Sequence, residues 1–272
     1  MTRAIEARLV TSPANPEIKR IRGLALRKKR EEEKLFVAEG LRHVTEALEA
    51  GWPLETLVYQ AEAAQRPKLA EALAATGAAG GLCLEVTEAV LAKMTKRDNP
   101  QMVVGVLRQR WQALENLRPG KLWIALETVR DPGNLGTILR TADAVAADGV
   151  ILIGETCDPY SPEAVRASMG SIVRVPLVRA TLDQFLAWRA GWPGLVVGTH
   201  LSGQADYREV SYAAPVLLLM GNEQAGLTEV AAAACDRLVR IPMAGGADSL
   251  NLSVATAVML FEIARDRLRL VP

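Results

Sequence analysis

The stretch KLWIALETVRDPGNLGTILRTADAVAADGVILIG, residues 121–154, has two apolar segments of strand length separated by a helical pattern. Between them, apolar residues recur with the spacing of one helix face, at Leu135, Ile138, Leu139, Ala142 and Val145. Two more apolar runs, GLVVGTH (194–200) and APVLLLMG (214–221), follow with helical patterns between them. Strands that are apolar on both faces and alternate with helices predict an α/β fold with a mainly parallel sheet.

The chain before this stretch predicts a smaller α/β domain. We expect a domain at residues 1–107, a linker at 108–120 that ends in Pro119-Gly120, and a second domain at 121–272. Predicted helices cover 16–33, 41–51, 61–75 and about 251–268; predicted strands cover 36–38, 54–60, 82–86, 102–108 and, as the last strand, 241–243. In the final helix we expect a buried stripe of Val254, Val258, Phe261, Ala264 and Leu268.

Composition narrows the class of protein. Half of the 272 residues are hydrophobic and the formal net charge is +1, so total charge indicates no polyanionic partner. The three cysteines are widely spaced and there are only two histidines, so we expect neither disulfides nor a metal site. The N-terminus has early charges and no apolar signal segment, and no apolar run is long enough to span a membrane. These features predict a soluble, cytoplasmic protein.

Basic residues gather near the N-terminus. Arg20, Arg27, Lys28 and Arg30 belong to this cluster, which is compatible with contacts to phosphate groups; the alternative is a solvated helix face that the acidic run 31–33 compensates.

Polar residues follow the predicted strands of the second half in three loops. In DPGNLGTILR we expect Asn134 to cap the helix, and Arg140 has the small neighbours Gly136 and Ala144 one turn away. The alternative for Arg140 is an ion pair with Asp143 or simple exposure to solvent. Ligands of parallel α/β sheets bind at the carboxyl ends of the strands, so these loops predict a site.

The second loop, LLLMGNEQAGL, places Asn222 and Glu223 between two glycines, and the third, IPMAGGADSLNLSVATA, places Ser249 and Asn251 at the start of the final helix. Neither a G-x-G-x-x-G fingerprint nor a P-loop is present, which disfavours a dinucleotide-dependent oxidoreductase and an NTPase.

Together the three loops resemble the three sequence motifs of the SpoU–TrmH family of RNA ribose 2′-O-methyltransferases, in family order over most of residues 121–265. The segment from Asn15 to Gly51 resembles the L30e-like substrate-binding domain that many members carry. The resemblance implies a SPOUT-type domain with a C-terminal trefoil knot, an exception to the rule that chains do not thread loops. It also implies a homodimer formed through the knotted domain.

The resemblance further implies an S-adenosylmethionine pocket and a catalytic group. The implied cofactor-binding residues are Thr199, His200, Leu219, Gly221, Ile241, Met243, Leu250 and Ala255. The implied catalytic residues are Asn134, Arg140, Glu223, Ser249 and Asn251. Arg140 would act on the ribose 2′-hydroxyl, and because a guanidinium stays protonated in proteins we favour stabilisation of the developing alkoxide over a role as base.

The implied partner is RNA, which we expect to be ribosomal. The alternatives are a tRNA 2′-O-methyltransferase and a non-catalytic RNA-binding protein. A role in antibiotic resistance is compatible with the same residues.

Overall fold

The computed structural model describes residues 7–95 and 100–269, which form two compact units. The first unit comprises residues up to Gln109 together with Tyr160–Arg174, and the second comprises Arg110–Pro159 and the residues from Val175 onward. The boundary between Gln109 and Arg110 falls within the predicted linker. The predicted second domain, 121–272, includes Tyr160–Arg174, but this segment belongs to the first unit: the Tyr160 ring packs against Phe36, with 4.7 Å between ring centroids.

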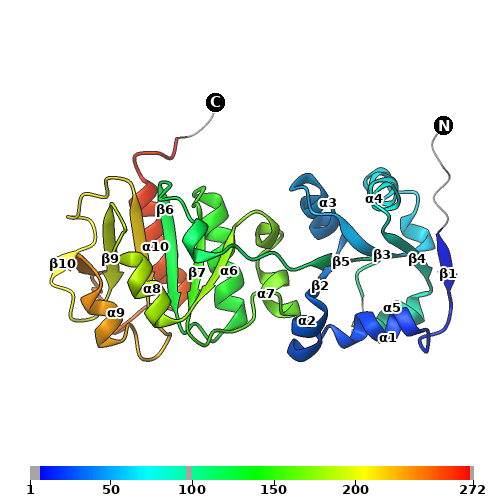
Figure 1. Ribbon diagram of the computed structural model, residues 1–272, viewed down its shortest axis with the longest axis horizontal. Coiled ribbons are helices and arrows are strands. Elements are labelled where there is room, and N and C mark those ends of the chain that lie inside the picture. Colours follow the sequence, from blue (N-terminus) through cyan, green and yellow to red (C-terminus); the bar gives the residue numbers. More distant parts are fainter. Residues whose placement is uncertain (1–6, 96–99, 270–272) are drawn as a thin grey trace. The chain divides into compact units, whose positions relative to one another are not determined.

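The N-terminal unit is a five-stranded mixed sheet in the order β1-β4-β3-β5-β2. Its strands are β1 (Arg8–Val10), β2 (Leu35–Glu39), β3 (Leu54–Gln60), β4 (Leu82–Val86) and β5 (Val103–Arg108). Its helices are α1 (Pro16–Gly23), α2 (Arg27–Glu33), α3 (Leu41–Glu49), α4 (Pro67–Ala78), α5 (Glu88–Thr95) and α7 (Pro162–Ala167), with short 3-10 turns at Ala61–Ala63 and Ser171–Val173. Helices α3 and α4 cover one face of the sheet, and α1 and α5 cover the other (Figure 1).

The predicted single helix at 16–33 is wrong: the chain breaks between α1 and α2. Leu24 is buried in the core under the sheet. The guanidinium of Arg30 donates hydrogen bonds to the carbonyl oxygens of Leu24 (2.7 Å) and Ala25 (2.9 Å), which fixes the turn between the two helices.

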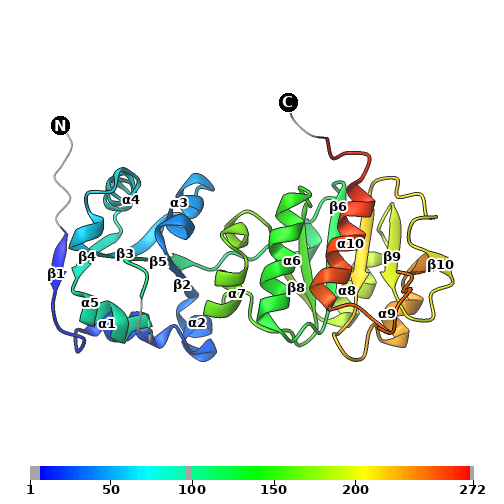
Figure 2. The same ribbon diagram turned by 180° about the vertical axis from the view of Figure 1, so that it is seen from behind.

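The second unit is a seven-stranded parallel sheet in the order β10-β12-β9-β11-β6-β7-β8, as predicted for this half. Its strands are β6 (Leu122–Glu127), β7 (Gly149–Ile153), β8 (Leu177–Ala180), β9 (Leu195–Thr199), β10 (Ala205–Asp206), β11 (Val216–Met220) and β12 (Arg237–Arg240). Its helices are α6 (Pro132–Ala144), α8 (Leu182–Arg189), α9 (Glu229–Ala233) and α10 (Leu252–Ala264), with a 3-10 turn at Leu114–Asn116. Helices α6 and α10 lie side by side on one face of the sheet and α8 lies on the other (Figures 1 and 2).

The central strands are buried on both faces, which explains their continuous apolar sequences. Every residue of β6, β7 and β11 is buried. On α6, the five apolar positions predicted for the inner face are all buried, whereas Arg140 is exposed. The polar residues that follow β6, β9, β11 and β12 therefore gather at one edge of the sheet, where the carboxyl ends of parallel strands meet.

Two predictions about the C-terminal segment are wrong. The last strand is β12, which ends at Arg240, so residues 241–243 begin the loop after it. The buried face of α10 carries Leu252, Thr256, Met259, Leu260 and Ile263. Of the predicted stripe, Ala264 is buried as expected, whereas Val254 and Phe261 are 48% and 51% exposed. The predicted stripe is rotated from the observed one because α10 is apolar on nearly all sides, so sequence periodicity does not single out one face. Whether the chain is knotted stays a prediction.

Candidate active site

The loop after β6 begins the site. Asp131 is the N-cap of α6, and its carboxylate accepts a hydrogen bond of 2.6 Å from the backbone N–H of Asn134. Our prediction that Asn134 caps this helix is therefore wrong. Asp131 takes the cap position because Pro132 occupies the first helical turn, where its missing N–H costs nothing. The amide side chain of Asn134, one turn into the helix, is thus left to make other contacts.

The loop after β11 is a tight backbone turn. The backbone groups of Asn222 and Gly226 exchange hydrogen bonds of 2.9 and 3.0 Å. The side-chain oxygen of Asn222 accepts from the N–H groups of the next residues of the turn, and its Nδ2 donates to the carbonyl of Thr128 (2.9 Å). A Cβ on Gly221 would lie 2.0 Å from the carbonyl carbon of Gly226, so only glycine fits there. This turn is therefore bound directly to the loop after β6.

Glu223 joins the first two loops. Its carboxylate accepts hydrogen bonds from the backbone N–H groups of Arg130 (3.3 Å) and Asp131 (3.2 Å), and from Nδ2 of Asn134 (3.5 Å). The third loop joins through Asn251, whose Nδ2 donates to Oδ1 of Asn134 (3.0 Å). Asn251 also caps α10, as its predicted position at the start of this helix suggested. Residues 117 positions apart in sequence thus meet in one polar chain, Glu223–Asn134–Asn251.

The other two predicted catalytic residues lie outside this chain of contacts. Arg140 is exposed on α6, and it makes no hydrogen bond or ion pair with any residue that the structure describes. The alternative ion pair with Asp143 is therefore not formed. Ser249 lies on the exposed loop two residues before Asn251 and makes no hydrogen bond within the described ranges 7–95 and 100–269.

The residues predicted to hold the cofactor follow three adjacent strands, β12, β9 and β11. Thr199 ends β9 and its hydroxyl lies 3.3 Å from the sulfur of Met220, at the end of β11. His200 donates its backbone N–H to the carbonyl of Val239 in β12 (3.0 Å). The structure therefore brings together the predicted residues at these strand ends, which are Thr199, His200, Leu219, Gly221 and Ile241.

The remaining predicted cofactor residues lie on the third loop and the first turns of α10. Met243 is 36% exposed, Leu250 is half-buried just before the cap residue Asn251, and Ala255 is half-buried in α10. Between them, a Cβ on Gly245 or Gly246 would meet no atom within 4 Å. Space is therefore open beside the backbone of this loop at Gly245 and Gly246, and its backbone groups can contact a ligand.

Two residues that the sequence analysis did not select belong to the same region. Glu127 ends β6, is 2% exposed, and accepts hydrogen bonds from the backbone N–H (2.9 Å) and hydroxyl (2.7 Å) of Thr228. Burial, with the carboxylates of Glu223 and Asp131 nearby, raises the pKa of Cys157 to about 12. The sequence contained a signal for Glu127, because a carboxylate at the end of an apolar strand is costly to bury unless a hydrogen-bond donor contacts it.

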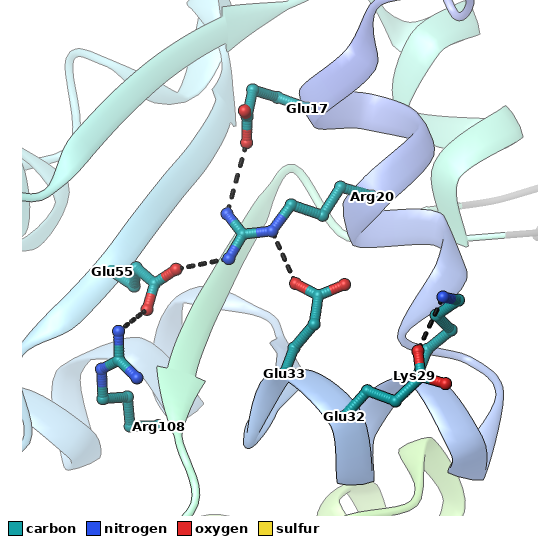
Figure 3. Close-up of polar contacts among 7 residues, drawn as sticks. All are labelled: Glu17, Arg20, Lys29, Glu32, Glu33, Glu55 and Arg108. Atoms are coloured by element: carbon teal, nitrogen blue, oxygen red, sulfur yellow. Dashed lines mark hydrogen bonds and ion pairs between the residues drawn. The ribbon is translucent and has the colours of Figure 1, made fainter.

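The predicted phosphate-binding arginines of the N-terminal unit have partners within the protein. Arg20 donates to Glu33 (2.6 Å) and Glu55 (2.7 Å) and also approaches Glu17 (Figure 3). Arg27 pairs with Glu31 at 2.8 Å, and Lys28 lies 4.0 Å from Glu32.

Arg30 does not fit the predicted role, because its side chain is buried and holds the turn between α1 and α2. The acidic run 31–33 compensates the basic segment, as the alternative interpretation of this segment expected.

Comparisons with known proteins agree with the resemblance found in the sequence. Residues 121–261 match the model of the SpoU rRNA methylase family, and residues 15–105 match that of the MRM3-like substrate-binding domain. A 23S rRNA (uridine(2479)-2′-O)-methyltransferase of Streptomyces viridochromogenes is 36% identical, over 90% of this chain and 88% of that protein. A 23S rRNA (guanosine(2553)-2′-O)-methyltransferase of Bacillus subtilis (strain 168) is 29% identical, over 93% of this chain and 98% of that protein.

Among solved structures, the crystal structure of an AdoMet-bound rRNA methyltransferase from Sinorhizobium meliloti is 51% identical, with a TM-score of 0.91 over 97% of this chain and 99% of that one.

Proposed function

The chain belongs to the SpoU rRNA methylase family, and on that premise we propose that it transfers a methyl group from S-adenosylmethionine to a ribose 2′-hydroxyl of ribosomal RNA. The observation that carries the proposal is the contact chain Glu223–Asn134–Asn251, which links one residue from each of the three family motifs. A chain that had lost catalysis and kept only RNA binding would not need this polar connection.

The cofactor pocket is proposed at the carboxyl ends of β9, β11 and β12. S-adenosylmethionine, when bound, supplies an electrophilic methyl group on a positively charged sulfur. The backbone of Gly221 and of the loop around Gly245 and Gly246 would contact the cofactor, and Thr199 and Leu219 would form the floor of the pocket. The S. meliloti relative was crystallised with AdoMet bound, which supports this choice of cofactor.

Arg140 is proposed as the group that makes the ribose oxygen reactive. A hydroxyl is a poor nucleophile, and a guanidinium beside it stabilises the negative charge that develops on the oxygen as its proton leaves. Arg140 is exposed and has no carboxylate partner in the described part of the chain, so its charge is available to the RNA. Glu223 and Asn251 are proposed to position Asn134, and Ser249 and Asn134 to hold the ribose or its phosphate.

We also propose that two copies of the chain associate through the C-terminal unit. Val254 and Phe261 are seven residues apart on α10, so they lie on the same side of the helix, and both are about half exposed. Large apolar side chains exposed along one helix side are typical of an interface. Replacing Phe261 with Glu should convert a dimer to a monomer in light scattering; a wild-type chain that is already monomeric at micromolar concentration would contradict the proposal.

The function is tested by incubating the protein with S-adenosylmethionine carrying a labelled methyl group and with a 23S rRNA transcript. We expect label in the RNA and one nucleotide that resists alkaline cleavage, because a 2′-O-methyl group removes the attacking hydroxyl. A transcript with a 2′-deoxy sugar at that nucleotide is the control and should take up no label. Label on a base, or no transfer to rRNA when tRNA is methylated, would contradict the proposal.

A cytoplasmic location stays a prediction. Within the described residues no helix has the length and apolar character of a membrane span.

A further inference from the structure

A cavity of about 300 Å³ lies within the N-terminal unit, and none of the residues that line it is a predicted site residue. It is bounded by the end of β2, by the start of α3 and by α7. Its polar lining residues are Glu39, Arg42, His43, Gln101 and Arg166, and Val165 contributes part of the apolar wall. A cavity of this size is at the lower end of those that hold small ligands.

A buried polar group without a partner lines this cavity. His43 is 9% exposed, and its Nε2 is buried and makes no hydrogen bond to any residue that the structure describes. Burial lowers the pKa of His43 and outweighs the backbone groups of Val165 and Glu39, which act in the opposite direction, so the ring is neutral near pH 7. Gln101 adds an amide near the ring: a Cβ placed on Gly40 would lie 3.4 Å from Oε1 of Gln101 and 3.8 Å from Nδ1 of His43.

The two arginines of the cavity differ from several other arginines of this unit, which carboxylates bind closely. Arg20 is held by three carboxylates (Figure 3), Arg27 by Glu31 and Arg174 by Glu46. In contrast, Arg166 is exposed and makes no ion pair within the described chain. Arg42 is 65% exposed and only approaches Glu46, at 3.9 Å, while that carboxylate already binds Arg174. The cavity lining thus carries two exposed guanidinium groups, those of Arg42 and Arg166, together with the carboxylate of Glu39.

We propose that the cavity holds one unstacked nucleotide of the RNA substrate, an inference that rests on the proposed function. Arg42 and Arg166 would bind the flanking phosphates, and the base would lie against Val165 with its edge at His43 and Gln101. The carboxylate of Glu39 accepts hydrogen bonds and repels anions, so it suits the amino group of a base and keeps phosphate at the mouth. Proteins read RNA sequence in unstacked nucleotides rather than in the duplex, whose major groove is too narrow for side chains.

The test compares three variants of the full chain. Arg166→Gln and Gln101→Leu alter the cavity, one with and one without a change of charge. Lys68→Gln is the matched control, because Lys68 is an exposed residue of α4 outside the cavity and its replacement removes the same charge. For each variant, the affinity for a 23S rRNA transcript is measured at several salt concentrations, and the affinity for S-adenosylmethionine is measured by calorimetry.

We expect Arg166→Gln to weaken RNA binding by about fivefold or more and to reduce the magnitude of the salt slope by about 0.7, the contribution of one phosphate contact on single-stranded RNA. Gln101→Leu should weaken binding without changing the slope. Lys68→Gln should behave as wild type, and cofactor affinity should be the same in all. If wild type binds and methylates the RNA but Arg166→Gln and Gln101→Leu match Lys68→Gln, the cavity is not a nucleotide site. If wild type neither binds nor methylates rRNA, the proposed function itself fails.

Discussion

Replacing Glu127 with Gln should weaken the connection between two loops of the active site. The Glu127 carboxylate at the end of β6 accepts hydrogen bonds from both the N–H and the hydroxyl of Thr228, the N-cap of α9. Thr228 ends the turn that carries Glu223, whose other end is bound to Thr128 through Asn222. Glu127 therefore fixes the far end of this turn to the strand that precedes Asn134.

The size of the effect follows from the geometry. Gln has the shape of Glu, so no cavity forms, but its amide nitrogen must face one of the two donors of Thr228. One hydrogen bond to a charged acceptor is lost, which costs about 1.5–3 kcal/mol. For a unit of this size a loss of about 2 kcal/mol lowers the melting temperature by roughly 4–8 °C.

Tryptophan fluorescence is suited to this measurement, because four of the five tryptophans, Trp111, Trp123, Trp188 and Trp192, lie in the C-terminal unit. The control Glu71→Gln, at an exposed position of α4, should change stability by less than about 0.5 kcal/mol. In a double-mutant cycle, Glu127→Gln and Thr228→Val should show a coupling energy of about 0.5–3 kcal/mol. Additive effects, or a melting temperature that moves by less than about 1 °C, would refute the role of this pair.

Three further predictions concern other groups. All three cysteines should react slowly with iodoacetamide at pH 8 until the protein is unfolded, because burial raises their pKa values, to about 12 for Cys157 and Cys235. Intact-mass measurement that finds one rapidly modified cysteine in the folded protein would contradict this prediction. The free energy of unfolding of the N-terminal unit should fall as the pH drops below about 6.5, because the unfolded chain binds a proton at His43 that the folded chain does not. In denaturant titrations at several pH values, His43→Gln should reduce the slope of this free energy against pH. An unchanged slope would count against the prediction. Arg20→Gln should leave RNA affinity within about twofold of wild type, because Arg20 is already bound by three carboxylates. A large loss of RNA affinity in a binding assay would instead support the phosphate contact predicted for Arg20.

Strong, regular patterns predicted the fold well. The apolar runs that became β6, β7, β9 and β11 are buried on both faces, and this burial is what makes their sequences continuous. Prediction failed where one residue outweighed the pattern. Arg30 turns inward and breaks the helix expected at 16–33, and the evenly apolar α10 gave no clear buried face.

The site was predictable in its composition but not in its contacts. Asn134, Glu223 and Asn251 were selected as separate residues, and the sequence does not show that the start of α6, the turn after β11 and the cap of α10 meet through them. Glu127 was overlooked because it lies within an apolar strand and looks like part of it. The membership of α7 in the N-terminal unit was not predictable, since it depends on the contact of Tyr160 with Phe36, far away in sequence.

The central claim is that the positive charge of Arg140 makes the ribose oxygen reactive. The most direct test measures the single-turnover rate of methyl transfer for Arg140→Ala and Arg140→Lys at saturating S-adenosylmethionine and RNA. Because the lost interaction acts on the transition state, we predict that the alanine variant transfers methyl at least about a hundredfold more slowly, with unchanged cofactor affinity, and that lysine restores part of the rate. A rate for Arg140→Ala within threefold of wild type would contradict the claim.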